Sequence, residues 1–349
     1  MDEAAHHLER HLMFRQFFDL DNVENLKDNK LLKQYFPLGL VGKTGKNNHL
    51  LVVECAGRID LHGILKTIQL NEFLSQRLKF QEMMLDEINK MEQENKSQCS
   101  VIYILDLEGL KLDSSLLSVV TGPYHTLWNL VYTNYPEWVE TLFIVNAPAF
   151  ISIIWKAIGP LMPERTRNKV QIFTRTKESL QSHCDLKYVP KHWGGELTDS
   201  NGDPMCRDRI LIPTKSIPTN LYWQPDKMSP WIDKLESMTI NAGRFKIVTI
   251  KVSPTNEKIF LALNRFGERS YSIAIYHSKD LKDMNEWIPT FLYPPMPTVD
   301  LLKVVSLGPG IYKFRFGNED SWFRSVKLYY RIRFLNEHDD EIHWEQVNS

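Results

Sequence analysis

The segment "NYPEWVETLFIVNAPAFISIIWKAIGP", residues 134–160, decides how the rest of the chain is interpreted. A short apolar run at 142–146 predicts a buried strand, and a second apolar run at 149–159 predicts a helix. A helix that is apolar on all sides is usually buried in a core. The same two runs would also suit the lining and the lid of a chamber for an apolar molecule, so the segment alone leaves both interpretations open.

Apolar runs and helical periodicities alternate on both sides of this segment. Residues 101–107 are almost continuously apolar, as in a strand that is buried on both faces of a parallel or mixed sheet. Further strands are predicted at 49–55 and 170–173, and helices at 3–18, 67–94 and 114–133. Strands that alternate with helices predict an α/β layer structure with right-handed crossovers.

The pattern changes after about residue 196. A turn-rich stretch, "LTDSNGDPM" at 197–205, precedes four prolines between residues 213 and 230, which predicts a linker or an irregular connection. Beyond it the apolar period becomes two, because alternate side chains of "VKLYYRIRF", 326–334, share one face. Similar runs at 259–263, 271–276 and 311–316 predict an antiparallel β-sandwich.

Length and composition describe an ordinary globular protein. The chain has 349 residues, which favours two domains, with 43% hydrophobic and 24% charged residues. The formal net charge of -1 gives no overall field that would attract nucleic acid, so no nucleic-acid partner is expected.

The four cysteines and the chain start bear on the compartment. The cysteines lie far apart without a CxxC pair, which argues against a disulfide framework or structural zinc and favours a reducing compartment. The N-terminus lacks an apolar signal core, and no window reaches the roughly 18 apolar residues of a spanning helix. We expect a cytoplasmic protein with at most peripheral association to intracellular membranes.

The sequence offers little support for catalysis. "GLVGKTGK", 39–46, resembles a phosphate-binding loop but has two residues where that loop needs four, and it leads into a strand. No GxSxG, GxGxxG or HExxH motif occurs. His183-Cys184 is interpreted as incidental, and Asp106 and Glu108 as capping groups at a strand end rather than a ligand site. We expect no catalytic residue, no metal site and no cofactor.

A local excess of positive charge follows the second apolar run. Between residues 156 and 191 there are eight basic side chains and three acidic ones. A solvated surface would explain them. Contact with anionic lipid headgroups would also explain them, since each well-placed basic residue contributes about 1 kcal/mol there.

Several blocks now carry a family resemblance. They are Tyr135-Pro136-Glu137, Phe143-Ile144-Val145-Asn146-Ala147-Pro148 with Phe150 and Trp155, Thr166-Arg167-Asn168-Lys169-Val170, and "YVPKHWGGEL" at 188–197. Together, in this order and spacing, they resemble the CRAL-TRIO lipid-binding family from about residue 3 to 200. The C-terminal "PGIYKFRFGNEDSWFRSVKLYYRIRF", 309–334, resembles the last strands of a GOLD domain. The whole is similar to the group that contains supernatant protein factor and the tocopherol-associated proteins.

The resemblance implies a fold and a domain division. The expected fold is an α/β CRAL-TRIO domain, with a mixed sheet as floor, covering helices and a gate helix, followed by an all-β GOLD-type β-sandwich. The expected division is a remnant of an N-terminal helical lobe at 1–30, the lipid-binding domain at 31–200, a linker at 201–230 and the GOLD domain at 231–349. The family's "LLRFLRAR"-type segment and the GOLD Trp-x-Phe strand have no counterpart here.

The resemblance also implies a pocket between the sheet and a mobile gate helix at 149–159, with Asn146-Ala147-Pro148 as its hinge. Phe150, Ile154 and Ile158 are expected to face the cavity, and Ile151 and Trp155 to face elsewhere. The pocket and gate candidates are Tyr103, Leu105, Tyr124, Leu127, Phe143, Val145, Phe150, Ile151, Ile154, Trp155 and Ile158.

Three polar residues are headgroup candidates through the same resemblance. Glu137 and Lys169 match a glutamate and a lysine that the family ties to phosphoinositide binding, and Thr166 matches a headgroup-contacting threonine. A lysine recognises phosphate as a point charge. Surface solubility for Lys169, and a cap or salt bridge for Glu137, are the structural alternatives.

The resulting functional hypothesis is non-catalytic binding and intracellular transfer or presentation of a hydrophobic lipid. The ligand would be phosphatidylinositol or a tocopherol- or squalene-like terpenoid, with transient membrane contact. One alternative is a lipid-sensing adaptor that acts on a membrane or a protein partner through the GOLD domain. A remote alternative is an enzyme of unknown type.

Overall fold

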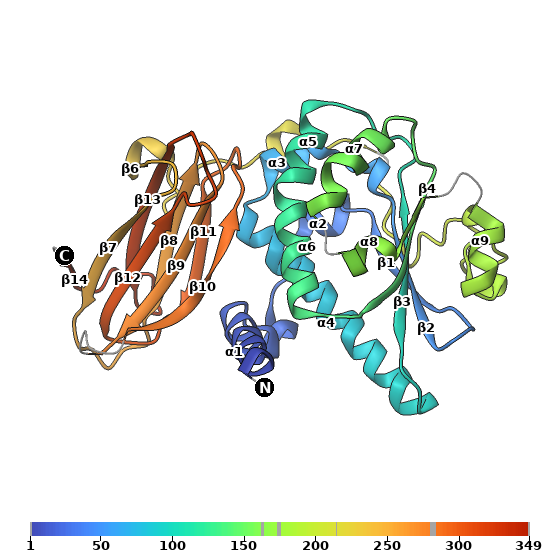
Figure 1. Ribbon diagram of the computed structural model, residues 1–349, viewed down its shortest axis with the longest axis horizontal. Helices are drawn as coiled ribbons and strands as arrows, with labels where there is room; N and C mark the ends of the chain where they lie inside the picture. The colour runs from blue at the N-terminus through green and yellow to red at the C-terminus, as the bar shows by residue number, and fades with distance from the viewer. Residues whose placement is uncertain (1, 162–163, 173–175, 214, 280–283, 348–349) are drawn as a thin grey trace.

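The computed structural model describes residues 2–161, 164–172, 176–213, 215–279 and 284–347, without the side chains of residues 2–3, 157–158, 161 and 176–179. An α/β unit forms one lobe and a β-sandwich forms the other (Figure 1). No helix in the described part of the chain is both long and apolar enough to cross a membrane.

The α/β unit is built on one mixed sheet with the strand order β1-β2-β3-β4-β5. β1 runs antiparallel to β2, and the remaining neighbours are parallel. The strands are β1 Leu38–Lys43, β2 His49–Glu54, β3 Ser100–Asp106, β4 Val139–Val145 and β5 Val170–Ile172. The sequence-based prediction of an α/β layer with a mixed sheet is therefore confirmed.

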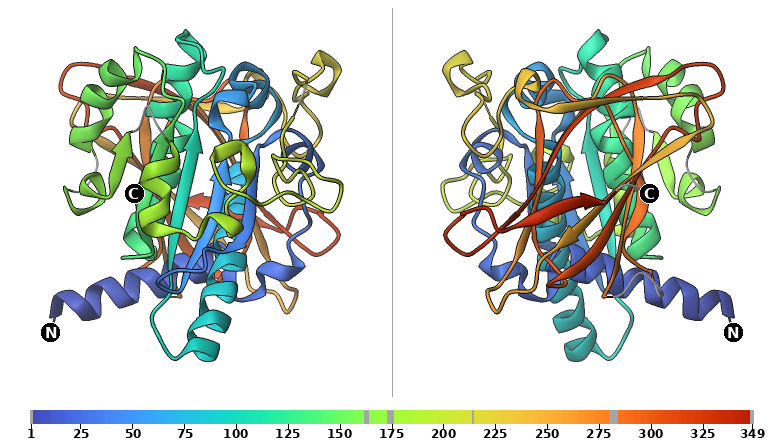
Figure 2. Two further views of the ribbon diagram at one scale, coloured as in Figure 1. Left: turned by 90° about the vertical axis from the view of Figure 1, so that its right-hand side faces the viewer. Right: turned by 90° about the vertical axis from the view of Figure 1, so that its left-hand side faces the viewer.

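Helices cover both faces of this sheet, with α4 to α7 on one side and α9 on the other (Figure 1). The helices are α1 Asp2–Phe17, α2 Lys30–Tyr35, α3 Leu61–Thr67, α4 Leu70–Asn95, α5 Ser114–Thr121, α6 Pro123–Asn134, α7 Ile151–Ile158, α8 Glu164–Asn168 and α9 Thr176–His183. α1 contacts both β10 and α6, and its exposed first half extends beyond the two lobes (Figure 2).

The helix predicted at 114–133 is two helices. Gly122 takes φ −111° and ψ −108°, which is outside the helical region, between α5 and α6. Pro123 occupies the first position of α6. Proline has no N–H to continue the preceding helix and disfavours the helical conformation of the residue before it, so the break falls at this pair.

Alternation along the buried strands divides the core between two faces of the sheet. The register places Leu105 beside Ile144 and Ile104 beside Phe143. Leu105 and Ile144 belong to the apolar cluster under α4 and α6. Ile104 and Phe143 belong to the cluster that packs against Leu180, Trp193 and residues 205–212 on the other side. This division fixes which side chains of β3 and β4 face the cavity described below.

The C-terminal lobe is a sandwich of two antiparallel sheets, with the orders β10-β9-β12-β7-β14 and β11-β8-β13-β6. The strands are β6 Glu236–Ile240, β7 Phe245–Val252, β8 Phe260–Gly267, β9 Tyr271–Ser278, β10 Asn285–Tyr293, β11 Asp300–Val305, β12 Gly310–Gly317, β13 Val326–Leu335 and β14 Trp344–Val347. The alternating runs named above lie in β8, β9, β12 and β13, so the prediction of a β-rich C-terminal region is confirmed.

The two lobes meet through polar and apolar contacts. The side-chain amide of Gln69 donates to the carbonyl of Val299 at 2.7 Å, and the backbone N–H of Asn71 donates to Asp300 Oδ1 at 2.9 Å. Part of the predicted linker is also packed, because Met205, Cys206 and Ile210 are buried against the far face of the α/β sheet. Residues 205–210 therefore complete the first lobe and do not form a free connection.

Candidate ligand cavity

A cavity of about 180 Å³ lies between the sheet and the helices α5, α6 and α7. Its floor comes from β3, β4 and β5, its wall from α5 and α6, and its roof from α7. The lining is largely apolar and consists of Ala56, Ile59, Leu61, Leu105, Leu107, Leu110, Leu116, Val119, Val120, Tyr124, His125, Trp128, Asn129, Tyr132, Leu142, Ile144, Ile151, Ile154, Trp155 and Val170.

The roof helix α7 is apolar on two opposite sides. Ile154 points inward with 6% of its surface exposed, whereas its neighbour Ile153 is 67% exposed. A helix of eight residues, Ile151–Ile158, with one basic side chain, Lys156, thus presents apolar groups both to the cavity and to the outside. A helix on the surface of a core normally has a polar outer side, so the exposed Ile153 departs from that pattern.

The segment that leads into α7 is fixed at its start. Asn146 adopts the left-handed conformation with φ 52°, which Asn tolerates better than most residues. Its side-chain amide donates to Asp106 Oδ1 at 2.8 Å. Pro148 and Ala147 follow before α7 begins at Ile151. The predicted hinge Asn146-Ala147-Pro148 thus begins with a residue held by a hydrogen bond and leads into α7.

Five of the predicted pocket residues line the cavity: Leu105, Tyr124, Ile151, Ile154 and Trp155. Ile151 and Trp155, which were expected to face elsewhere, therefore face the cavity, and Phe150 is not among the described lining residues because it precedes the first turn of α7. The side chain of Ile158 lies outside the described residues.

The two residues of β4 that were predicted to line the cavity lie on the other face of the sheet. Phe143 and Val145 pack on the opposite side of the sheet, and Leu142 and Ile144 line the cavity. A strand buried on both faces has no polar alternation, so the sequence gives no sign of which face meets the cavity. Leu127 is likewise absent from the lining, since it is buried in the cluster that includes Phe73 of α4.

Sequence reasoning missed most of the wall that α6 contributes. Tyr124, Trp128 and Tyr132 recur at intervals of four residues and all line the cavity, together with His125 and Asn129. Residues four apart lie on one face of a helix, so this aromatic stripe was the signal that could have revealed the wall. Burial lowers the pKa of His125, which keeps its imidazole neutral near pH 7.

A more polar pocket of about 200 Å³ adjoins the cavity and contains all three predicted headgroup residues. It is lined by Val131, Tyr132, Tyr135, Pro136, Glu137, Trp138, Val139, Arg165, Thr166 and Lys169. Tyr132 lines both pockets, so the polar pocket and the apolar cavity are neighbours. The strand β4 and the helices α7 and α8 separate Glu137 from Lys169 in the sequence, and the fold brings the two residues together.

The charges of this polar pocket are paired. Lys169 Nζ lies 2.7 Å from Glu137 Oε2 and donates to the carbonyl of Val139 at 2.8 Å, and Arg165 Nη1 lies 3.3 Å from Glu137 Oε1. The hydrogen bond from Lys169 holds the pKa of Glu137 below its ordinary value. The two bonds of Lys169 use two of its three N–H donors. The third can meet an additional oxygen acceptor.

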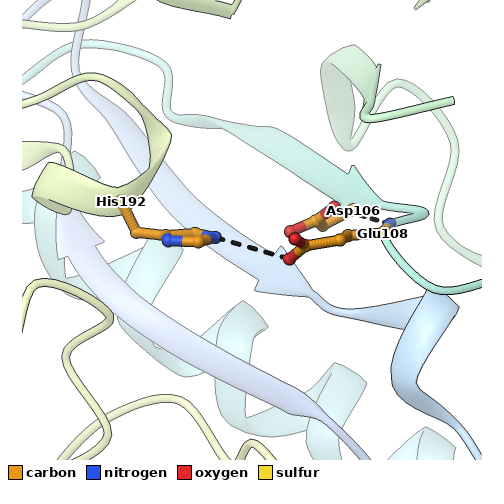
Figure 3. Close-up of side chains that lie close together, drawn as sticks. All are labelled: Asp106, Glu108 and His192. Carbon is orange, nitrogen blue, oxygen red and sulfur yellow. Dashed lines mark hydrogen bonds and ion pairs between the residues drawn. The ribbon is translucent and has the colours of Figure 1, made fainter.

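The strand-end carboxylates form a cluster with a histidine (Figure 3). Ligand atoms of Asp106, Glu108 and His192 lie within 4.8 Å of one another. Asp106, however, accepts bonds from the backbone of Glu108 at 2.9 Å, from Asn146 at 2.8 Å and from the indole of Trp193 at 3.0 Å. Glu108 pairs with Arg58. These bonds explain the cluster as strand-end capping.

Other features that the sequence raised are structural as well. The "GLVGKTGK" segment forms the β1–β2 hairpin, where Thr44 is buried and donates to the carbonyl of Lys46 at 2.8 Å. Cys184 is buried, and burial raises the pKa of its thiol to about 12, which is opposite to the activation a nucleophile needs.

The site thus consists of an apolar cavity covered by the short helix α7, with a more polar pocket beside it. Comparison with known proteins agrees. The CRAL/TRIO domain profile matches residues 33–195, and the profile named "F28H7_8_C:-like, C-terminal domain" matches residues 221–343. The chain belongs to the CRAL-TRIO domain-containing proteins, which are in general lipid-binding and lipid-transfer proteins.

Two curated relatives span most of the chain. CRAL-TRIO domain-containing protein F28H7.8 of Caenorhabditis elegans is 30% identical over 92% of this chain and 78% of its own length. Protein ctg-1 of the same organism is 24% identical over 95% of this chain and 87% of its own length. The solved structure of Sfh5 overlaps with a TM-score of 0.47 and 17% identity, over 62% of this chain and 74% of that one.

Proposed function

We propose that the protein binds one hydrophobic lipid in the cavity and transfers it between membranes or presents it at a membrane, without chemical change. The observation that carries the proposal is the apolar cavity roofed by α7, a helix with Ile154 turned inward and Ile153 turned outward. Such a helix can close the cavity in water and lie against lipid when it opens.

The energetics favour a closed container over an open groove. Each buried CH₂ contributes about 0.8 kcal/mol, so a chain of about sixteen carbons represents on the order of 12 kcal/mol. The cavity volume of about 180 Å³ is smaller than typical ligand pockets of roughly 300–1,000 Å³. A complete lipid therefore requires α7 to move outward, which is the motion expected of a gate.

Phosphatidylinositol is one ligand that the arrangement supports. Its acyl chains would occupy the apolar cavity, and its phosphate would reach the adjoining pocket with Glu137, Thr166 and Lys169. The remaining N–H of Lys169 would bind a phosphate oxygen, and Arg165, which is 76% exposed, adds a second positive charge. A tocopherol- or squalene-like terpenoid is the alternative ligand, supported by the family resemblance and by the apolar lining.

A membrane contact through the C-terminal sandwich is part of the same proposal. Trp322 and Phe323 are 86% and 93% exposed at the tip of the β12–β13 turn. Asn318 holds this turn by donating to the carbonyl of Arg324 at 2.8 Å. The strand β7 begins beside this turn, because Phe245 pairs with Gly317. The side chains of Phe245 and Ile247 are about half exposed. Exposed aromatic side chains of this kind favour the interface of a bilayer.

The sandwich also supports the alternative of a lipid-sensing adaptor, in which the same turn would contact a protein. We propose that residues 231–349 form a GOLD-type domain and that the protein is cytoplasmic with peripheral association to intracellular membranes. The division into 1–30 and 31–200 is likewise a proposal, and of the predicted linker 201–230 the part at 205–210 packs against the first lobe.

Mass spectrometry of organic extracts tests the proposal. The protein would be purified from its own cells, without detergent, and its extract compared with that of an unrelated protein prepared in parallel. A single enriched lipid class in about equimolar amount supports the proposal. An extract with no enriched lipid, from a protein that also takes up none from liposomes, contradicts it.

A further inference from the structure

A buried polar cluster lies directly behind the apolar wall of the cavity. At its centre is Glu54, the last residue of β2, which is fully buried. The hydroxyl of Tyr124 donates to Glu54 Oε1 at 2.7 Å, and Arg77 Nη2 lies 3.3 Å from Oε2. The hydroxyl of Tyr103 also donates to Oε2. We call these four residues the Glu54 cluster.

The Glu54 cluster reaches the cavity through its tyrosines. Tyr124 is itself a lining residue. The ring of Tyr103 packs edge-on against Trp128, another lining residue, with 6.3 Å between ring centroids. Arg77 belongs to α4, and its guanidinium carbon lies 4.7 Å from the centroid of the Phe36 ring. Tyr124 is therefore the member that the cluster and the cavity lining share, and Glu54, Arg77 and Tyr103 lie behind that lining.

The buried pair of Glu54 and Arg77 is weak evidence for a purely stabilising role. Taking an ion pair out of water has a large desolvation cost, and well-packed apolar side chains in its place are often as stable or more so. Burial of Tyr124 also raises the pKa of its hydroxyl well above the ordinary value, so this group stays a neutral hydroxyl. A neutral hydroxyl fixed at a cavity wall is suited to recognition.

The hydrogen-bond inventory indicates which ligand group fits. Tyr124 uses its proton on Glu54, so its oxygen retains lone pairs that can accept a bond. Within the described part of the chain, Arg77 Nε and Nη1 are buried without a hydrogen-bond partner. A ligand hydroxyl can donate to Tyr124. A carboxylate would place a second negative charge near Glu54, which is unfavourable.

We propose that the Glu54 cluster makes the cavity selective for a neutral lipid that carries a hydroxyl group, an alcohol or a phenol, over the hydrocarbon of the same shape. The ligand hydroxyl donates a hydrogen bond to Tyr124 Oη, and the carboxylate of Glu54, anchored by Arg77, orients Tyr124. The inference rests on the proposed function and identifies the chemistry of its neutral ligand.

A paired loading experiment tests the selectivity. The protein would be incubated with phosphatidylcholine vesicles that contain equal amounts of 1-hexadecanol, hexadecane and hexadecanoic acid, and then separated from the vesicles by gel filtration. Gas chromatography with mass spectrometry measures the ratio of the three probes on the protein. One hydrogen bond to a buried acceptor predicts an alcohol-to-hydrocarbon ratio that Tyr124→Phe lowers about five- to tenfold.

Tyr276→Phe is the matched control, because Tyr276 lies on β9 of the sandwich and does not line the cavity. The expected results are an unchanged ratio in Tyr276→Phe, a lowered ratio in Tyr124→Phe with hexadecane loading retained, and less acid than alcohol on the wild-type protein. An alcohol-to-hydrocarbon ratio that is equal in wild type and Tyr124→Phe overturns the inference, and so does preferential loading of the acid.

The wild-type protein separates this inference from the proposed function. A protein that loads none of the probes, and no phosphatidylinositol from vesicles, contradicts both. A protein that loads all three without preference contradicts only the role of the Glu54 cluster. If Tyr124→Phe unfolds, the wild-type order of alcohol, hydrocarbon and acid still decides the result, and Tyr103→Phe provides a second variant in which Glu54 loses one bond but Tyr124 keeps its own.

Discussion

Lys169 and Glu137 form an ion pair, with 2.7 Å between Nζ and Oε2, in a pocket that shares Tyr132 with the apolar cavity. Glu137 is half exposed and held in the left-handed conformation with φ 58°. A non-glycine residue in that conformation is uncommon and is tolerated only where its surroundings fix it. The pair thus places a partly buried ammonium in the polar pocket beside the apolar cavity.

Lys169→Ala is expected to reduce the uptake of phosphatidylinositol from vesicles about fivefold, because one partly screened ammonium–phosphate contact is lost. Uptake of a neutral terpenoid should be unaffected. Lys187→Ala is the control, since Lys187 forms an exposed pair with Asp185 at 3.1 Å that is separate from both pockets. Equal phosphatidylinositol uptake by Lys169→Ala and wild type would remove Lys169 from the site.

Adjacent residues of β4 should respond in opposite ways to enlargement. Ile144→Phe adds volume into the cavity, so it should lower lipid loading severalfold with little loss of stability. Val145 is fully buried in the packed far face, so Val145→Phe should lower the free energy of unfolding by about 1–3 kcal/mol or more. Loading assays and urea unfolding measure both. The same loss of loading in both variants at equal folded fraction would contradict the assignment of faces.

The double change Trp322→Ala and Phe323→Ala should weaken binding to anionic vesicles about tenfold or more, since two interfacial aromatic side chains are removed. Thermal unfolding should not change, because both side chains are almost fully exposed. Leu8→Ala with Leu12→Ala is the matched control, at 58% and 57% exposure on α1. Vesicle sedimentation measures the binding. Equal losses of vesicle binding in the two double variants would indicate non-specific adhesion.

Two glycines should differ sharply in their tolerance of alanine. A Cβ on Gly195 would lie 1.9 Å from the carbonyl oxygen of Val189, which is backbone and cannot move aside easily. A Cβ on Gly159 would meet its nearest neighbours at 3.8 Å. Gly195→Ala is therefore expected to lower the melting temperature by about 10 °C or to prevent folding, given overpacking costs of about 1–3 kcal/mol and more for backbone clashes. A melting temperature within error of the wild type would show that this turn differs from the one described.

Stability should fall on mild acidification. Burial lowers the pKa of His49, His125 and His277 below the ordinary value of 6.5. The unfolded state then binds protons at a higher pH than the folded state does, so this contribution is complete above about pH 6.5 and is lost as the pH falls below it. The urea midpoint should be lower at pH 5.5 than at pH 7.5.

The acid dependence has a specific control. Glu137 and Asp28 have lowered pKa values, so their contributions are lost only at still lower pH, below about 4. Replacing the three histidines by glutamine should therefore flatten the change between pH 7.5 and 5.5. A urea midpoint that is constant in wild type over this interval speaks against buried neutral histidines.

More of the fold than of the candidate site could be predicted from the sequence. The strand runs and the change to period two identified both lobes, because hydrophobic periodicity reports burial directly. The break at Gly122-Pro123 was missed, although both residues are helix breakers, because the apolar spacing continues across it. The polar pocket residues Glu137, Thr166 and Lys169 were brought together by family resemblance and not by any local pattern.

The lining of the cavity could not be predicted without knowing the fold. Phe143 and Ile144 are both apolar, and only the folded structure shows that Ile144 faces the cavity. The Glu54 cluster joins residues from β2, α4, β3 and α6. No periodicity in the sequence indicates that these residues contact one another. Long-range polar contacts of this kind depend on how helices cross the sheet, which the chain's local preferences leave open.

We propose above all that α7 closes a cavity that takes one lipid. Native mass spectrometry of the purified chain, after exposure to liposomes that contain phosphatidylinositol and a neutral terpenoid alcohol and then gel filtration, tests this. We expect one lipid bound per chain, and a reduced bound fraction in Ile144→Phe. A folded chain that emerges free of lipid would contradict it.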